Sequence, residues 1–339
     1  MNENIKKILV INFGGIGDEI LFLPTLISLK KTYPDAKITL ALEPRSKGIK
    51  DLTDVIENLF LVDVKSKNKY FEIFELIIEA QQGNFDLAVS AGGNKFMSII
   101  LFLTGIKRRY GYNTGKLSEL LLTEAVPLNK NQYACDMYHD LIAPITDIKT
   151  YLPEIKLASI VKEQNTVLIH PGVSKLSVQM GMIKTIPAEK WAKVIDLLVE
   201  GGKKVILAGG PDDKECIETI RNTITVKENE NFVDYYGKTK SLMDLARLIA
   251  SSEKFVCSDS APLHIAVALK VKTYVVFGPT DDKKLIPNSP DVVAIKHLDK
   301  PSDTCPLKPC LWEHRQTTCE IPSCLAIEPE KMVSMILHD

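Results

Sequence analysis

The sequence lacks the excess of positive charge that a general nucleic-acid binder usually carries. Its 339 residues hold 42 Lys and Arg against 43 Asp and Glu, a formal net charge of −1. It also lacks a long hydrophobic run, since the apolar stretch at 98–106 has about half the length that a membrane-spanning helix needs. The first ten residues carry no extended apolar segment typical of a secretory signal. We therefore expect a cytoplasmic protein that does not bind nucleic acid.

Two further absences narrow the choice of fold. The G-x-G-x-x-G fingerprint of dinucleotide-binding proteins is missing, which makes a nicotinamide dehydrogenase the least favoured enzyme class. There is no low-complexity segment and no short-period repeat, which argues against a repeat architecture. The length is sufficient for two ordinary domains.

Strand-like and helix-like segments alternate along the chain, in two successive series. A β-rich run at 8–13 enters a glycine-rich turn, an amphipathic helix-like stretch follows, and residues 37–42 form a second strand-like run. This βαβ pattern predicts a parallel sheet. The pattern continues with strands at 59–64 and 85–91 around a helix at 70–82.

The chain turns polar and irregular at 151–164 and then the alternation restarts. Strand-like runs at 166–172, 203–208, 254–257 and 272–277 alternate with helix-like segments at 187–200, 241–250 and 261–269, with Pro187 expected in the first turn of its helix. We predict an amino-terminal domain over 1–158, a second domain over 159–325 and a terminal helix in 326–339, for which packing back on the amino-terminal domain is left open. In open α/β sheets, ligands bind at the carboxyl ends of the strands, so motifs at these positions are candidate sites.

The first such motif runs from Gly14 through Gly15 to Asp18. Glycines allow a ligand to approach the backbone closely, and the following helix offers free N–H groups to an anion. Asp18 is interpreted either as a helix cap or as a general base that removes a proton from an acceptor hydroxyl.

Three motifs in the second half carry polar groups at strand ends. Gly172 and Ser174 offer hydrogen-bond donors after a predicted strand, and Lys184 downstream could place its charge on a diphosphate or lie at the surface. We interpret His170 as a structural histidine. Asp213, in the Gly209–Gly210–Pro211 turn, is either a helix-start acid or an acceptor for ribose hydroxyls.

The last of these motifs runs from Asp259 to His264. Ser260 and the free N–H groups of the following helix could hold a phosphate. Asp259 is unfavourable beside a phosphate unless it caps the helix or binds a sugar hydroxyl. His264 is interpreted either as a site residue or as packing between helix and sheet.

In this order and spacing the motifs resemble those of glycosyltransferase family nine, the ADP-heptose:lipopolysaccharide heptosyltransferases. The resemblance rests on GGIGD near the start, HPG with a downstream lysine before Pro-Ala-Glu, GGP followed by an acid, DS-x-P-x-H and FGPTD, and it covers nearly the whole chain. It implies an α/β GT-B fold with two Rossmann-like domains facing across a cleft. It also implies an inverting transfer of a sugar from a nucleotide diphosphate donor, here ADP-heptose, to a glycolipid such as the lipopolysaccharide core or to a protein, without a required cofactor.

Carried onto this chain, the resemblance makes Asp18 the base that deprotonates the acceptor. It makes Lys184 the donor-phosphate lysine, and Asp259, Ser260 and His264 parts of the donor site; Gly14, Gly15, Gly172, Ser174 and Asp213 complete the predicted donor-binding set. Two positions depart from the family, Ile186 in place of the usual Trp and Ala261 in place of the usual Gly. Both departures fall near the donor.

Four cysteines form a separate cluster with the spacing C-x4-C-x8-C-x4-C, namely Cys305, Cys310, Cys319 and Cys324. Four thiolates suit tetrahedral zinc or iron, which could stabilise this proline-rich loop. The alternative is reduced thiols in a loop, and His314 is a possible substitute ligand.

Two other functions remain open from the sequence. A sugar-nucleotide epimerase can share the two-domain architecture, but it needs acid and base groups on both faces of the sugar, and only one clear base is present. A nucleotide-sugar-binding protein without turnover is the non-enzymatic alternative. Peripheral association with the inner face of a membrane is compatible with a lipid-linked acceptor.

Overall fold

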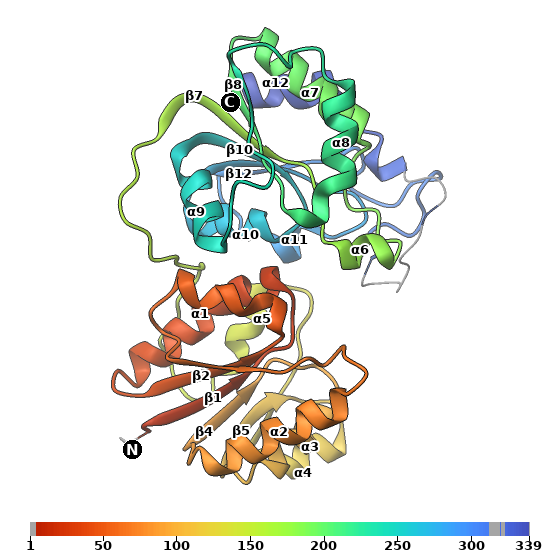
Figure 1. Ribbon diagram of the computed structural model, residues 1–339. Coiled ribbons are helices and arrows are strands. Elements are labelled where there is room, and N and C mark those ends of the chain that lie inside the picture. The colour runs from red at the N-terminus through yellow and green to blue at the C-terminus, as the bar shows by residue number, and fades with distance from the viewer. Residues whose placement is uncertain (1–4, 312–318, 320–322, 339) are drawn as a thin grey trace. The chain divides into compact units, whose positions relative to one another are not determined.

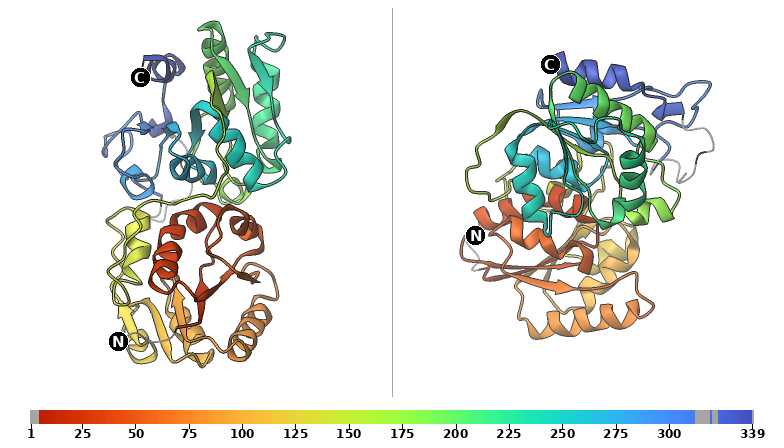
Figure 2. Two further views of the ribbon diagram at one scale, coloured as in Figure 1. Left: turned by 90° about the vertical axis from the view of Figure 1, so that its left-hand side faces the viewer. Right: turned by 45° about the horizontal axis from the view of Figure 1, so that its top comes forward.

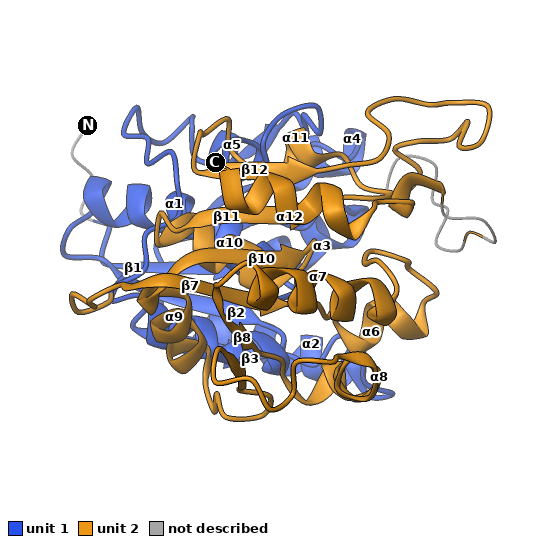
Figure 3. Ribbon diagram, turned by 90° about the horizontal axis from the view of Figure 1, so that it is seen from above, with its two compact units in different colours: residues 1–156 blue, residues 157–339 orange. Residues whose placement is uncertain are grey.

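The chain folds into two α/β units, described by a computed structural model for residues 5–311, 319 and 323–338. One unit spans 1–156 and the other 157–339, coloured separately in Figure 3. The predicted division at 158/159 falls in the same irregular segment between the units. No helix or strand occurs between α5 (Ala134–Asp140) and β7 (Glu163–His170), in agreement with the irregular segment expected at 151–164.

Unit 1 is built on a parallel six-stranded sheet in the order β3-β2-β1-β4-β5-β6. The central strand β1 is buried on both sides, as expected for a strand that reads as a continuous apolar run. The predicted parallel α/β arrangement is confirmed. The strands are β1 (Lys7–Ile11), β2 (Lys37–Leu42), β3 (Asn58–Leu61), β4 (Leu87–Ser90), β5 (Arg108–Tyr112) and β6 (Glu124–Val126).

Helices cover both faces of this sheet. On one face, α1 (Ile16–Thr32) packs beside α5, and on the other lie α2 (Lys69–Gln82), α3 (Lys95–Leu103) and α4 (Lys116–Leu121) (Figures 1 and 2). Leu76 of α2 and Leu101 of α3 share a buried cluster with Leu9 and Ile11 of β1, which fixes the face that α2 and α3 cover. A short 3-10 helix, η1 (Pro44–Leu52), follows β2.

Unit 2 repeats the topology, with the parallel order β12-β11-β10-β7-β8-β9. Reading from β9 gives the same sequence of crossovers as in unit 1. Its further strands are β8 (Lys204–Leu207), β9 (Phe232–Asp234), β10 (Ser252–Ser258), β11 (Lys272–Val276) and β12 (Val292–Ile295). Its helical segments are α6 (Lys175–Gln179), α7 (Ala188–Glu200), η2 (Pro211–Asp213), α8 (Lys214–Thr223), α9 (Leu242–Ser251), α10 (Ala261–Ala268), α11 (Asp282–Leu285), η3 (Ser323–Leu325) and α12 (Pro329–His338).

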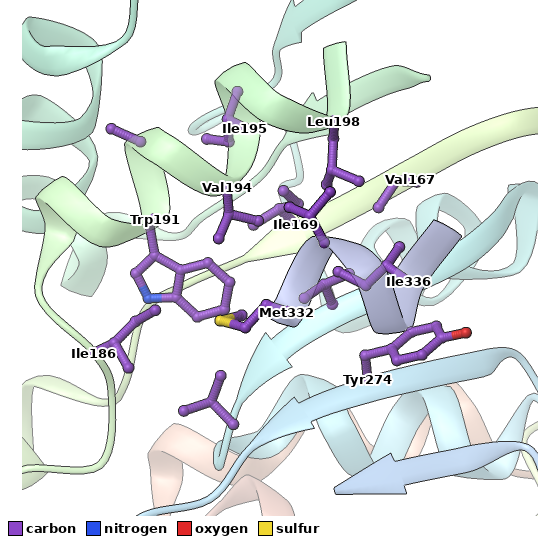
Figure 4. Close-up of a cluster of buried hydrophobic side chains, with 14 of the residues drawn as sticks. Val167, Ile169, Ile186, Trp191, Val194, Ile195, Leu198, Tyr274, Met332 and Ile336 are labelled. Carbon is purple, nitrogen blue, oxygen red and sulfur yellow. The ribbon is translucent and has the colours of Figure 1, made fainter. Parts of the chain in front are cut away.

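The core of unit 2 is organised around Trp191 of α7, which is fully buried. Figure 4 shows its indole between Ile186 and Met332. Because Met332 and Ile336 of α12 belong to this core, the terminal helix packs against α7 of its own unit. The structure buries the apolar face of this helix within unit 2, which differs from the packing on the amino-terminal domain that the sequence left open.

Pro187 also differs in detail from its expected position. It precedes α7 as the N-cap residue, so the helix begins at Ala188. The residue still starts the helix, because its fixed φ suits the entry to a first turn.

Candidate active site

The glycine-rich turn of unit 1 connects β1 to α1 at the carboxyl edge of the sheet. Gly15 is the N-cap of α1 and Asp18 is the third helical residue, whose Oδ2 accepts a hydrogen bond from the Gly15 N–H at 2.8 Å. A Cβ added to Gly14 would lie 2.4 Å from Cβ of Asp18, so the turn needs glycine to close on the helix. The Gly15 amide thus binds the Asp18 carboxylate, whereas the sequence predicts that Gly15 contributes to donor binding.

Asp18 caps the helix and is also open to solvent. The Asp18 side chain is exposed, and its Oδ1 accepts a hydrogen bond from the Tyr138 hydroxyl at 3.4 Å. Burial, followed by the charge of Asp18, raises the pKa of Tyr138 well above its usual range, so this hydroxyl keeps its proton and donates. The ring of Tyr138 is held edge-on against Phe22 of α1, with ring centres 5.1 Å apart. The helix-cap and base interpretations of Asp18 are therefore compatible.

Glu19 follows Asp18 directly but points into the protein. Only 1% of the residue is exposed, and the side chain of Asn12 opposes the effect of burial on its pKa only in part. Burial, and then the neighbouring charge of Asp18, raise the pKa of Glu19 well above the usual value for a glutamate. The raised pKa favours the neutral form of Glu19, directly beside the exposed Asp18.

The end of β2 adds charge to the same edge of unit 1. Glu43 is buried, and its Oε2 accepts hydrogen bonds from Arg45 Nε at 2.6 Å and from Lys65 Nζ at 3.0 Å. The Arg45 guanidinium lies beside Gly15, 3.6 Å from the position of an added Cβ. Sequence reasoning missed Glu19, Arg45 and Tyr138. Only Glu19 offered a signal, as a charged residue inside an apolar helical run.

In unit 2, Lys184 is not a surface lysine. Its side chain is 13% exposed, and its Nζ lies 3.0 Å from Oδ2 of Asp259, whose side chain is 4% exposed. The Thr280 hydroxyl donates to the same Oδ2 at 2.8 Å. The structure thus brings together two predicted site residues from separate motifs. An ammonium has three donors, so a bond to Asp259 leaves two for another anion.

Behind this ion pair, three segments are joined by hydroxyl groups. The hydroxyls of Thr185 and Ser258 lie 2.8 and 2.6 Å from the Pro171 carbonyl oxygen and 2.7 Å from each other. Trp191 Nε1 donates to Thr185 Oγ1 at 2.9 Å. This network ties the Lys184 loop to the ends of β7 and β10, which positions the ammonium. The threonine next to Lys184 was not singled out from the sequence.

Ser260 and His264 both belong to the amino-terminal half of α10, Ser260 as its N-cap and His264 within the helix. The Ser260 hydroxyl lies 3.4 Å from the Ser258 carbonyl oxygen. In the first turn Pro262 has no N–H and the Leu263 amide donates to the Ser260 carbonyl oxygen at 3.0 Å, so the Ser260 hydroxyl and the Ala261 amide are the groups that could face an anion. His264 is 5% exposed within α10, which favours the packing interpretation. Ser174 is exposed and caps the short helix α6, accepting a hydrogen bond from the Ser177 amide.

His170, Gly172 and Asp213 form a second, buried cluster in unit 2. Oδ2 of Asp213 accepts from the Gly210 amide at 2.7 Å and lies 3.6 Å from Nε2 of His170. A Cβ on Gly172 would lie 1.7 Å from Oδ1 of Asp213, so only glycine fits there. Burial lowers the pKa of His170 and raises the pKa of Asp213. This environment favours the helix-start interpretation of Asp213 over binding of ribose.

The two departures from the family pattern have different environments. Ile186 is 1% exposed and belongs to the core around Trp191 (Figure 4), so its side chain faces the protein interior. Ala261 is the first residue of α10 and is partly exposed.

The predicted metal ligands Cys305, Cys310, Cys319 and Cys324 are free thiols. Burial and then the neighbouring Cys305 raise the pKa of Cys310, and the same two causes raise the pKa of Cys324 to about 11. Among residues 5–311, 319 and 323–338, no three His, Cys, Asp or Glu side chains are arranged to hold a metal ion, so these thiols do not fit one as placed. The possible substitute His314 lies outside the described residues.

Helices long and apolar enough to cross a membrane are likewise absent from the part of the chain that the structure describes. The apolar stretch at 98–106 falls largely within α3, where Met97 and Leu101 are buried against the sheet. The core on that side accounts for Ile100, Leu101 and Ile106, whereas Phe102 and Leu103 are about half exposed.

Comparison with known proteins matches this chain to one family. The model of glycosyltransferase family 9 (heptosyltransferase) matches residues 73–314. Lipooligosaccharide heptosyltransferase 2 of Campylobacter jejuni is 24% identical over 94% of this chain and 93% of its own length. Lipopolysaccharide heptosyltransferase 3 of Escherichia coli K12 is 26% identical over 78% and 80%. In structure, the E. coli ADP-heptose LPS heptosyltransferase II superposes with a TM-score of 0.76 over 97% of both chains at 18% identity.

Proposed function

We propose that this chain, which belongs to glycosyltransferase family 9, transfers a heptose from ADP-heptose to a hydroxyl group of a lipopolysaccharide core. The family match makes it a glycosyltransferase of the heptosyltransferase family with a GT-B fold. The donor and acceptor are our proposal, supported by what relatives of similar length are named for. With this acceptor, we also propose that the enzyme works in the cytoplasm, as the sequence predicts.

The single observation that carries the proposal is the environment of Asp18. Its carboxylate is exposed at the carboxyl edge of a parallel sheet, where ligands of such folds bind, and its two oxygens are oriented by the Gly15 amide and the Tyr138 hydroxyl. A general base needs to be accessible and fixed in orientation. In the proposed reaction, Asp18 takes the proton from the acceptor hydroxyl as its oxygen attacks the anomeric carbon and the bond to the diphosphate breaks, with inversion.

The donor diphosphate is assigned to Lys184 and the start of α10. The Lys184 ammonium is held in place by Asp259 and retains donors for phosphate oxygens, and Ser260 lies at the beginning of the helix. These groups would stabilise the negative charge on the departing diphosphate. Because they supply the charge stabilisation, we expect transfer to need no metal ion, and treatment with a chelator should leave the rate unchanged.

The proposal is tested with a panel of nucleotide sugars. Thermal shift with ADP-heptose, GDP-mannose, UDP-glucose and UDP-N-acetylglucosamine identifies the donor, because a ligand that binds only the folded state raises the melting temperature. Mass spectrometry then follows heptose addition to a heptose-deficient core glycolipid. Donor binding without product would favour the non-enzymatic alternative, and conversion of the free nucleotide sugar without acceptor would favour an epimerase.

A further inference from the structure

Two cationic side chains at the carboxyl edge of unit 1 have no part in the proposed reaction so far. Arg45 lies in η1, directly after β2, and Lys65 lies in the segment between β3 and α2. Both bind one carboxyl oxygen, Oε2 of Glu43, from Arg45 Nε at 2.6 Å and from Lys65 Nζ at 3.0 Å. Because two cations share one carboxylate, the three side chains together carry a net positive charge.

The guanidinium of Arg45 is fixed on one side and open on the other. The Glu43 side chain that accepts from its Nε is 4% exposed, whereas the Arg45 side chain is 39% exposed. Among the residues that the structure describes, Nη1 and Nη2 of Arg45 have no hydrogen-bond partner. These two nitrogens form one edge of the guanidinium, and such an edge binds a carboxylate or a phosphate through two parallel hydrogen bonds.

The missing side chain of Gly15 leaves a gap between Arg45 and Asp18. A Cβ on Gly15 would lie 3.6 Å from Nη2 of Arg45 and 3.6 Å from Oδ2 of Asp18, and outside the flanking residues no atom would be closer. The Ser46 hydroxyl donates to the Gly14 carbonyl oxygen at 3.4 Å, which joins η1 to the glycine-rich turn. The guanidinium and the carboxylate thus border the same point, and one small group placed there can contact both.

Stability does not explain why Arg45 lies beside this gap. Its partner Glu43 is two residues away in sequence, and a partly exposed ion pair between such neighbours contributes little to folding. The contact that joins the end of β2 to the segment before α2 is made by Lys65, 22 positions from Glu43. Without Arg45, the buried Glu43 carboxylate would still have Lys65 as its partner.

We propose that Arg45 determines acceptor specificity by binding an anionic substituent, a carboxylate or a phosphate, on the acceptor sugar. One sugar residue carries both this substituent and the reacting hydroxyl, because Arg45 and Asp18 border one gap. As the hydroxyl oxygen bonds to the anomeric carbon and the diphosphate leaves, the proton passes to Asp18 while the anionic group stays on the guanidinium. The inference rests on the proposed sugar transfer and adds the chemical class of its acceptor, an acidic sugar.

Transfer from ADP-heptose to three forms of a heptose-deficient core oligosaccharide tests this inference. The forms are the native one, a dephosphorylated one and a carboxyl-reduced one. On the native acceptor, Arg45→Gln should raise the acceptor KM about ten- to a hundredfold, because hydrogen bonds to a charged group are lost, with the donor KM unchanged. On the form that lacks the bound anion, wild type and variant should have the same acceptor KM, which identifies the anion as carboxylate or phosphate.

Three further variants sharpen this test. Arg45→Lys keeps the charge without the planar guanidinium and should recover part of the loss. Arg221→Gln is the matched control and should leave the acceptor KM unchanged, because Arg221 Nε also binds a carboxylate, that of Asp234, at 2.6 Å and the side chain is 38% exposed. Gly15→Ala suits the backbone φ of −79° and places a methyl group in the gap, so it should fold and raise the acceptor KM.

An unchanged acceptor KM in Arg45→Gln would overturn the inference. An equal rise on all three acceptors would also overturn it, since a structural role does not depend on the anion, and a rise in the donor KM alone would assign Arg45 to the diphosphate instead. If the wild type transfers heptose to none of the acceptors, the proposed function fails. Isothermal titration of the same oligosaccharides then tests Arg45 by itself, and equal affinity of wild type and Arg45→Gln for the native form would exclude an anion site.

Discussion

The two units share a sheet topology and one capping device, yet they place the capping aspartate in opposite environments. In each, a Gly N–H is bound by an Asp three residues later, Gly15 by Asp18 at 2.8 Å and Gly210 by Asp213 at 2.7 Å. Asp18 is exposed, whereas Asp213 is 6% exposed and faces His170. The same local motif thus leaves an exposed carboxylate in unit 1 and a buried one in unit 2.

The units also differ in how they treat buried charge. The buried carboxyls Asp213 and Asp259 of unit 2 lie against His170 and Lys184, and Glu43 of unit 1 lies against Arg45 and Lys65. Glu19 of unit 1 differs, because burial outweighs the effects that lower its pKa. Burial of a carboxyl favours its neutral form. The raised pKa of Glu19 therefore favours a neutral carboxyl beside the exposed Asp18 in unit 1.

The largest effect is expected at Asp18, the exposed aspartate of unit 1. Replacing Asp18 by Asn keeps an acceptor for the Gly15 amide but removes the base, so turnover should fall by about 10²- to 10⁴-fold. Donor affinity, measured by isothermal titration, should change little, because the donor is assigned to unit 2. Turnover close to wild type would refute the base assignment.

The next effect concerns the buried ion pair of unit 2. Lys184→Ala should weaken donor binding by about ten- to a hundredfold, since a charge-assisted hydrogen bond contributes about 1.5–3 kcal/mol. It should also lower the melting temperature, because Asp259 is left buried without its partner.

Two variants serve as controls for this change. Lys184→Arg keeps the charge and should recover the melting temperature, and Lys193→Ala removes an exposed lysine of α7 with no expected effect. Unchanged donor affinity in Lys184→Ala would exclude a diphosphate role.

Glu19→Gln tests whether the pKa of the buried Glu19 carboxyl is raised in the folded state. Because the pKa of Glu19 is raised in the folded state, the wild type loses stability as the pH rises from the unfolded value of about 4.3 towards the folded one. The Gln variant lacks this loss, so its unfolding free energy should gain on that of the wild type by up to about 1.4 kcal/mol per pH unit in this window. Denaturant titrations from pH 5 to 9 measure the difference, and parallel pH curves for both proteins would contradict a buried neutral Glu19.

The smallest effect is expected at the structural aspartate of unit 2. Asp213→Ala removes the cap on Gly210 and should cost about 0.5–2 kcal/mol of stability, while the folded enzyme keeps its affinity for donor. Equilibrium unfolding and donor titration separate the two quantities. A large loss of donor affinity with unchanged stability would restore the ribose-binding interpretation that the sequence left open.

Much of the architecture could be predicted from the sequence because strand and helix periodicity is local. The βαβ alternation, the irregular segment near 151–164 and the parallel sheets all follow from the spacing of apolar residues and from turn residues. The destination of α12 could not be predicted, because an amphipathic helix shows which face is buried but not against what. Its contacts with α7 depend on the surface that Trp191 and its neighbours present.

The amino-acid sequence by itself determined which residue types stand at the strand ends: the glycines, Asp18, Lys184 and the Asp259–Ser260 pair. Only the tertiary structure decided their environments, since burial and ion pairing depend on residues far apart in the chain. Lys184 meets Asp259 across 75 positions and Tyr138 meets Asp18 across 120. For the same reason the buried Glu19 and the exposed Asp18, adjacent in sequence, have different chemistry: one side chain enters the core and the other remains in water.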